Sequence, residues 1–232
     1  MKRLYTQKTK QKIYYKMPAI EKVTPPTTEL YEEIPNFLDQ KYFDHLYAII
    51  NQGKSQFYWN FQEEVAYKGD VSPDSKDAFY FIHPVFNELG PQSGFHKELQ
   101  PLYEQLGVRA LLRTRVIMYV NQGRFMVHSP HIDYNYPHSA ALLYMNTCNG
   151  YTLLADEHVN IQASQSVIDS KDHKSPTSLE FKREDNDQLP FQDQNKSMSV
   201  ANKMTIHDGS RPHCSTTTTD QKKRILIAIN YF

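Results

Sequence analysis

The last eight residues most constrain the fold of this 232-residue chain. The segment Ile225 to Phe232 is almost continuously apolar, which is typical of a strand buried inside a sheet. Such a strand needs neighbours, and the chain changes after Gly107 from helical to strand patterning. We expect those neighbours at residues 111–120, 140–146, 151–155 and 198–207, with Asn149-Gly150 forming a tight turn between the second and the third.

The first half of the chain is patterned for helices. Apolar residues recur at helical spacing in Asp39 to Gln52 and again from about Phe95 to Leu106, where Pro101 predicts a kink. Aromatic runs at 56–61 and 79–82 predict two further strands. Helices followed by many short strands predict an α+β fold that is mainly β, with the helices packed against a sandwich or barrel.

Changes in composition divide the chain into regions. Residues 1–27 are basic and predict a flexible arm, and residues 28–232 predict a single domain. Within that domain we expect helical support over about 36–107 and a β core over about 108–232. Residues 160–197 are mostly polar and interrupt this core as an insertion, either a functional lid or a disordered loop.

The charge balance and the cysteine content exclude several classes of function. The 26 basic and 26 acidic side chains cancel, whereas a protein that binds nucleic acid by charge is usually basic, so nucleic acid is an unlikely partner. No apolar run is long enough to span a membrane, and we expect none. Cys148 and Cys214 form no metal or redox motif, and the N-terminus lacks an apolar signal segment. We therefore expect a cytoplasmic protein.

The residues that carry chemistry are His131-Ile132-Asp133 and the distant His213. In an extended segment, residues two apart point to the same side, so His131 and Asp133 converge. A second imidazole from a neighbouring strand completes a facial set of two histidines and one carboxylate, which leaves three positions open and suits non-haem Fe(II). Arg224 opens the last buried strand, where a guanidinium needs an anionic partner.

On these residues the chain resembles the Fe(II)- and 2-oxoglutarate-dependent dioxygenases, nearest their prolyl-hydroxylase-like branch and uncharacterised members carried by tailed marine bacteriophages. The resemblance covers about residues 111–232 and reaches weakly back to about residue 36. The matching segments are His131-Ile132-Asp133, Leu143 to Asn146 with Asn149 to Thr152, Ile206 to His213, and Arg224 to Phe232.

The resemblance implies a double-stranded β-helix, a jelly-roll-like barrel, and assigns roles by position. His131, Asp133 and His213 would ligate Fe(II), and Arg224 would bind the distal carboxylate of 2-oxoglutarate. Tyr144, and Tyr119 on the strand before the His-x-Asp segment, match tyrosines that reach the same carboxylate. The implied reaction couples oxidative decarboxylation of 2-oxoglutarate to succinate with hydroxylation of an organic or peptide substrate by molecular oxygen. Ascorbate is an optional reductant, and no further catalytic side chain is implied.

Other interpretations of the same residues stay open at this stage. A zinc hydrolase also uses two histidines and a carboxylate, and a barrel that only binds a partner would keep the fold. We expect His128 to lie beside the metal site or in solvent, and His207 to be structural, because Gly209 and Pro212 interrupt its strand. The sequence does not identify the substrate; peptidyl-proline is an analogy from the nearest branch.

Overall fold

The computed structural model describes residues 31–51, 57–66, 75–155 and 195–232. The basic arm 1–27 and residues 160–194 of the polar insertion lie outside these ranges. The elements, in chain order, are β1 (Tyr31–Ile34), α1 (Gln40–Asn51), β2 (Asn60–Gln62), the short 3₁₀ helix η1 (Ser75–Asp77), β3 (Tyr80–Asn87), β4 (Gly90–Pro91), α2 (Phe95–Glu98), α3 (Gln100–Leu106), β5 (Leu111–Val120), β6 (Ser139–Tyr144), β7 (Tyr151–Leu154), β8 (Lys196–Met198), β9 (Met204–Asp208), β10 (His213–Ser215) and β11 (Lys223–Tyr231).

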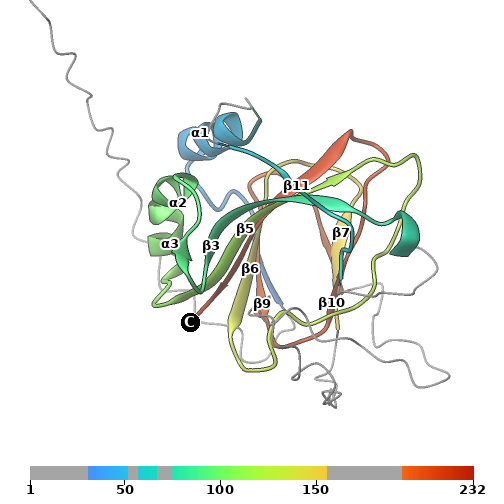
Figure 1. Ribbon diagram of the computed structural model, residues 1–232. Helices are drawn as coiled ribbons and strands as arrows, with labels where there is room; N and C mark the ends of the chain where they lie inside the picture. The colour runs from blue at the N-terminus through green and yellow to red at the C-terminus, as the bar shows by residue number, and fades with distance from the viewer. Residues whose placement is uncertain (1–30, 52–56, 67–74, 156–194) are drawn as a thin grey trace, which may run out of the picture.

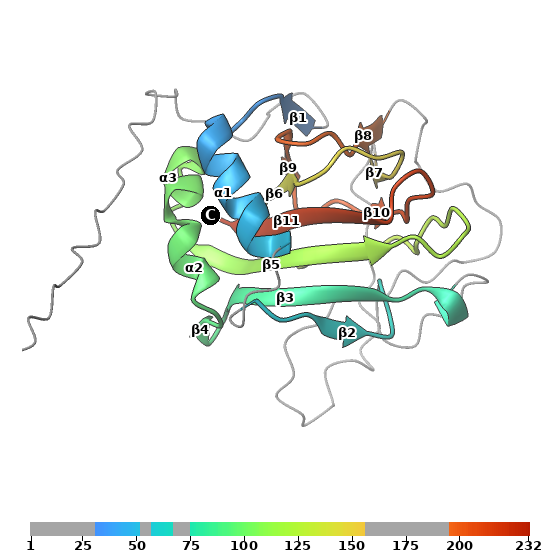
Figure 2. The same cartoon turned by 90° about the horizontal axis from the view of Figure 1, so that it is seen from above.

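The strands form two antiparallel sheets. The large sheet has eight strands in the order β1-β9-β6-β11-β5-β3-β2, with β4 added beside β3. The small sheet has three strands in the order β10-β7-β8. Figure 1 shows the small sheet on one side of the large sheet and the helices on the other. Figure 2 shows β3, β5 and β11 running side by side, so the C-terminal strand is central, as its apolar sequence predicts.

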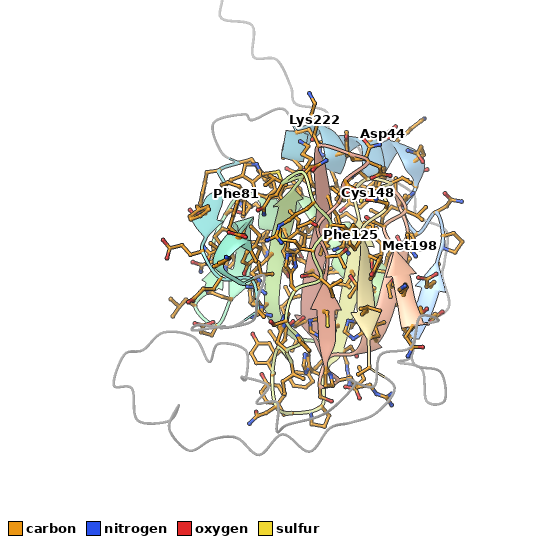
Figure 3. The ribbon with its side chains drawn as sticks, turned by 90° about the vertical axis from the view of Figure 1, so that its right-hand side faces the viewer. Asp44, Phe81, Phe125, Cys148, Met198 and Lys222 are labelled. Atoms are coloured by element: carbon orange, nitrogen blue, oxygen red, sulfur yellow. The ribbon has the colours of Figure 1, made fainter. Side chains whose placement is uncertain are left out.

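The large sheet has two faces with different partners because successive side chains of a strand point to opposite sides. On β11, Ile225, Ile227 and Ile229 join the main hydrophobic core, which also contains the buried faces of the three helices. Leu226 and Ala228 lie in a second cluster on the opposite face, towards the small sheet. Figure 3 shows how densely side chains fill the interior of the molecule.

One helix has a side-chain cap at its start, and another ends at a glycine: α3 stops at Gly107, whose φ of 69° is left-handed. The Asp39 carboxylate accepts hydrogen bonds from the backbone N–H groups of Lys41 and Tyr42 at 3.0 and 3.3 Å and so caps α1. The single helix expected over 95–106 is two helices, because the chain breaks at Leu99 and Pro101 lies in the first turn of α3. Proline is tolerated there since the first turn needs no N–H donor.

The mainly β class with a few helices is confirmed, and so are the strands expected at 111–120 and at the C-terminus. Two strand predictions are wrong in their connections. The Asn149-Gly150 turn does not make a hairpin, because β6 belongs to the large sheet and β7 to the small one. The strand expected at 198–207 is divided into β8 and β9 around Asn202, whose φ of 59° is left-handed.

Three further boundaries differ from the sequence prediction. The aromatic run expected as a strand at 56–61 contributes only Asn60 and Phe61 to the sheet, as part of β2, since its residues Phe57 and Trp59 pack into the helical core instead. The segment 36–107 is not purely helical support, because β2, β3 and β4 join the large sheet. The polar insertion ends earlier than predicted, at β8, whose Ser197 is fully buried. No helix in the described ranges is long and apolar enough to cross a membrane.

Candidate metal centre

The structure brings His131, Asp133 and His213 together. One ligand atom from each lies within 4.8 Å of the others, and this is the only such cluster among the described residues. His131 and His213 form an isolated antiparallel bridge, with N–H to carbonyl hydrogen bonds of 3.0 and 2.9 Å in the two directions. This bridge places the two imidazoles on the same side, with ring centres 4.5 Å apart. The backbone pairing therefore brings the His-x-Asp segment and a histidine from a neighbouring strand together, as predicted from the sequence.

Both imidazoles are oriented for metal binding. The Nδ1 atom of His131 lies 3.4 Å from the carbonyl oxygen of Ser129, and that of His213 lies 3.3 Å from the carbonyl oxygen of Arg211. Each Nδ1–H therefore donates to the backbone and leaves the lone pair on Nε2 free for a metal. Burial lowers the pKa of His131, and lowers the pKa of His213 to about 4, so both rings are neutral at pH 7.

The Asp133 carboxylate is held at both oxygens. Arg113 forms an ion pair with Oδ1, and the side-chain amide of Asn230 donates to Oδ2 at 2.8 Å. Burial alone would raise the pKa of Asp133, but Arg113, with smaller contributions from His213 and Arg115, holds that pKa well below its usual range. The carboxylate is therefore charged and fixed in orientation.

The roles of Asn230 and Arg113 were not predicted from the sequence, although both residues leave a signal in it. Asn230 is a polar residue within the apolar run of β11, and Arg113 alternates with apolar residues along β5. Each is a polar side chain on a buried strand, which requires a buried polar partner.

Among the residues that the structure describes, Arg224 is the largest fully buried side chain, at 0% exposure. Its Nη1 donates to the carbonyl of Thr216 at 3.1 Å and its Nη2 donates to the Thr152 hydroxyl at 2.8 Å. Its Nε is buried and has no hydrogen-bond partner. No described carboxylate forms an ion pair with this guanidinium. A buried cation without an anion is costly, so the arrangement calls for an anionic ligand.

The two tyrosines flank this guanidinium. The rings of Tyr119 and Tyr144 are centred 5.6 and 5.5 Å from the Arg224 guanidinium carbon. Tyr119 is directly opposite Arg224 in the β5–β11 register, and burial raises its pKa to about 12, so its hydroxyl stays protonated. The Tyr144 hydroxyl lies 3.0 Å from Ser197 Oγ and 3.2 Å from Thr152 Oγ1, the same hydroxyl that Arg224 contacts.

One cavity connects the histidine–aspartate cluster with the neighbourhood of Arg224. It is lined by all three members of that cluster and by Tyr119 and Thr152. Gly150 leaves room for the Arg224 side chain, because a Cβ there would lie 2.7 Å from Arg224 Cδ and 2.7 Å from the Thr217 carbonyl oxygen. The third residue of β10, Ser215, also lines this cavity between His213 and Thr216.

His128, His207 and the two cysteines lie outside the cluster. His128 is 4% exposed rather than solvated, and its Nδ1 lies 2.8 Å from Ser215 Oγ. His207 is 1% exposed, and its Nδ1 donates to the Asp208 carbonyl at 3.0 Å, in keeping with a structural role. Cys148 and Cys214 are buried free thiols.

Comparison with solved structures shows a shared fold. The α-ketoglutarate-dependent epimerase SnoN from nogalamycin biosynthesis is 15% identical, with a TM-score of 0.54 over 88% of this chain and 78% of that one. A SnoN complex with Fe³⁺, α-ketoglutarate and nogalamycin RO has a TM-score of 0.50 at 13% identity, with the same coverage. A prolyl-4-hydroxylase from Pseudomonas putida has a TM-score of 0.50 at 13% identity, over 88% of this chain and 93% of that one.

No protein-family model matches the chain, and no curated protein matches its sequence. The similarity to these structures therefore defines the fold alone. The chain has a fold like that of the 2-oxoglutarate- and Fe(II)-dependent oxygenases, prolyl hydroxylases included, and this fold carries a His-Asp-His triad. The expected double-stranded β-helix agrees with this match.

Proposed function

We propose that this protein is a non-haem Fe(II)- and 2-oxoglutarate-dependent dioxygenase that hydroxylates an organic substrate. The single observation that carries the proposal is the fully buried Arg224, which has no carboxylate partner among the described residues and donates to the Thr152 hydroxyl, a group that lines the cavity of the triad. A metal cluster in a cavity and a buried anion-binding group directly behind its lining fit a ligand that chelates a metal at one end and carries a carboxylate at the other.

The residues present fit both groups. Two neutral imidazoles with free Nε2 atoms and one charged carboxylate form a donor set typical of non-haem Fe(II), and they leave positions for a co-substrate and oxygen. Arg224, through its unpartnered Nε and its Nη atoms, would hold the distal carboxylate of 2-oxoglutarate. When bound, the metal and 2-oxoglutarate supply oxygen activation, with succinate and carbon dioxide as by-products.

The other side chains of the cavity position and shield these groups. Tyr119 and Tyr144 cover two sides of the guanidinium with aromatic rings, and Thr152 links Arg224 to the Tyr144 hydroxyl. Arg113 and Asn230 fix the orientation of Asp133. We assign no general base, because no titratable group other than those already named is required for hydrogen abstraction from a C–H bond. Ascorbate would serve only to keep the metal reduced.

The alternatives explain less of the site. A zinc hydrolase uses the triad but has no need of a buried arginine without an anion behind the lining of the same cavity. A barrel that only binds a partner has no need for two imidazoles whose Nδ1 donors are both used by the backbone, leaving both Nε2 atoms free. Nothing in the cavity lining singles out a peptidyl-proline substrate.

A calorimetric titration of 2-oxoglutarate into the protein, with and without Mn(II) as an oxygen-stable substitute for Fe(II), tests the proposal. Because the ligand should be held at both ends, we expect affinity at least about tenfold higher with the metal, and succinate formation when Fe(II) and air replace Mn(II). The His213→Ala substitution should abolish the increase in 2-oxoglutarate affinity that the metal causes. Equal binding with and without metal, or no binding, would contradict the proposal.

A further inference from the structure

Two arginines lie on the cavity face of β5, and the chemistry proposed above uses only one of them. Arg113, Arg115, Ile117 and Tyr119 alternate along the strand and so share one face. In the β5–β11 register, Tyr119 is opposite Arg224 and Arg115 is opposite Ala228, four residues further along each strand. Arg115 is therefore displaced from the Arg224 end by about 13 Å, towards the triad.

Arg115 lines the cavity without a matched anion. Its Nη2 is 4.0 Å from Asp133 Oδ1, the same oxygen with which Arg113 forms the shorter ion pair. Its Nε is buried and has no hydrogen-bond partner, although the side chain as a whole is 22% exposed. Among the described residues, Asp133 is the only carboxylate that pairs with either arginine, so two guanidinium groups share one negative charge.

The charge surplus persists when the proposed cofactors are added. The two charges of Fe(II) and that of Arg224 are balanced by Asp133 and the two carboxylates of 2-oxoglutarate. Arg113 and Arg115 then remain as two positive charges beside the metal ligands in a low-dielectric cavity. A buried surplus of this kind is costly unless a ligand neutralises it.

We propose that the substrate of this protein is an organic acid, and that Arg115 is a specificity-determining residue that binds its carboxylate. The inference rests on the proposed function and extends it to the substrate. Arg115 is the guanidinium available to such a ligand, because Arg113 forms the shorter ion pair with Asp133, and a planar guanidinium fork matches the two oxygens of a carboxylate. Val65, Ile117 and Leu142 also line the cavity and fit an aliphatic body attached to that carboxylate.

The test is a binding measurement with matched pairs of probes. Protein loaded with Mn(II) and saturating 2-oxoglutarate, without oxygen, is titrated with butanoate, hexanoate and octanoate and with the corresponding primary amides. Saturating 2-oxoglutarate keeps the probes away from Arg224. We expect at least one acid to bind about tenfold or more tightly than its amide, as a charge-assisted hydrogen bond provides.

Three variants separate this role from a structural one. Arg115→Gln should remove the preference for the acid while the affinities for Mn(II) and 2-oxoglutarate stay within about threefold of wild type. Arg115→Lys should keep part of the preference, since it retains the charge without the planar fork. Arg124→Gln removes the same charge from a surface ion pair with Asp77 and should change nothing.

The outcomes that overturn this inference differ from those that overturn the proposed function. The assignment of Arg115 is wrong if no acid binds better than its amide, whether both bind or neither does. It is also wrong if Arg115→Gln retains the preference, or if it chiefly weakens 2-oxoglutarate and so assigns Arg115 to the co-substrate. Failure of the wild-type protein to bind Mn(II) and 2-oxoglutarate at all would instead refute the proposed function.

Discussion

Replacing Arg224 by methionine should separate the effect of this arginine on the stability of the ligand-free protein from its role in binding 2-oxoglutarate. The guanidinium is fully buried and has two hydrogen bonds but no carboxylate partner among the described residues. Replacing a buried ion pair with apolar side chains of similar volume is often neutral or stabilising by about 1–4 kcal/mol, and a buried charge without a charged partner has no ion-pair energy to lose. We therefore expect Arg224→Met to remove 2-oxoglutarate binding while destabilising the ligand-free protein by no more than about 1 kcal/mol.

The change in the free energy of unfolding caused by Arg224→Met is the sum of a stabilising and a destabilising contribution. Removing the buried charge stabilises the fold by about 1–4 kcal/mol. Leaving the carbonyl of Thr216 and the hydroxyl of Thr152 without a donor costs about 1 kcal/mol or more each, although Thr152 keeps its contact with Tyr144. The free energy of unfolding of the ligand-free variant should thus lie between about 1 kcal/mol below and about 2 kcal/mol above the wild-type value.

The assay is urea denaturation of wild type and variant, with and without Mn(II) and 2-oxoglutarate. A ligand at one hundred times its dissociation constant raises the free energy of unfolding by about 2.7 kcal/mol, and only the wild type should show this increase on adding 2-oxoglutarate. Arg124→Met, which breaks an exposed ion pair, serves as the control and should stay within about 1 kcal/mol.

A ligand-free Arg224→Met protein less stable than wild type by more than about 2 kcal/mol would refute this reasoning, because it would show that the arginine stabilises the fold by itself. Retention of the 2-oxoglutarate-dependent increase in the variant would equally refute the assignment of Arg224 to the co-substrate.

Three further outcomes follow from the same structure. Gly150→Ala should lower the free energy of unfolding by about 1–3 kcal/mol and weaken 2-oxoglutarate binding, because its Cβ would lie 2.7 Å from both Arg224 Cδ and a backbone oxygen; wild-type values in urea denaturation and calorimetry would contradict this. Asn230→Ala should reduce Mn(II) affinity about 10- to 100-fold, because Asp133 loses the amide that orients it; a calorimetric titration in which Mn(II) affinity is unchanged would show that Arg113 suffices. The protein should lose stability as the pH rises above about 10, because burial raises the pKa values of Tyr119 and Tyr231 to about 12 and the unfolded chain ionises first; a urea midpoint that stays constant from pH 9 to about pH 12 would contradict this.

The sequence predicts the strands that are buried on both faces better than those that are not. The bounds of β5 and β11 follow from their apolar and alternating patterns. The pairing of β6 and β7 does not follow, because Asn149-Gly150 signals a turn but does not reveal whether the chain returns to the same sheet. The split of α2 and α3 at Leu99 likewise depends on how the two segments pack, which Pro101 only indicates.

In the candidate site, too, some residues are predictable from local sequence pattern and others are not. The convergence of His131, Asp133 and His213 follows from side-chain alternation once a bridge between their segments is assumed. The involvement of Asn230, Arg113 and Arg115 does not follow from local pattern, because it depends on the β5–β11 register, which aligns Arg113 with Asn230 and Arg115 with Ala228. Register is a long-range property, and here it is set by the packing of two faces against different partners.

The most direct test of the central claim is an oxygen-free titration of the metal-free protein with Fe(II) and 2-oxoglutarate, followed by visible absorption. A metal-chelated 2-oxo acid gives a charge-transfer band, and the account predicts a saturable band that is absent in His213→Ala and shifted to much higher 2-oxoglutarate concentrations in Arg224→Met. No band at saturating Fe(II), or a band of equal affinity in Arg224→Met, would contradict the claim that this cavity binds 2-oxoglutarate between the triad and the buried arginine.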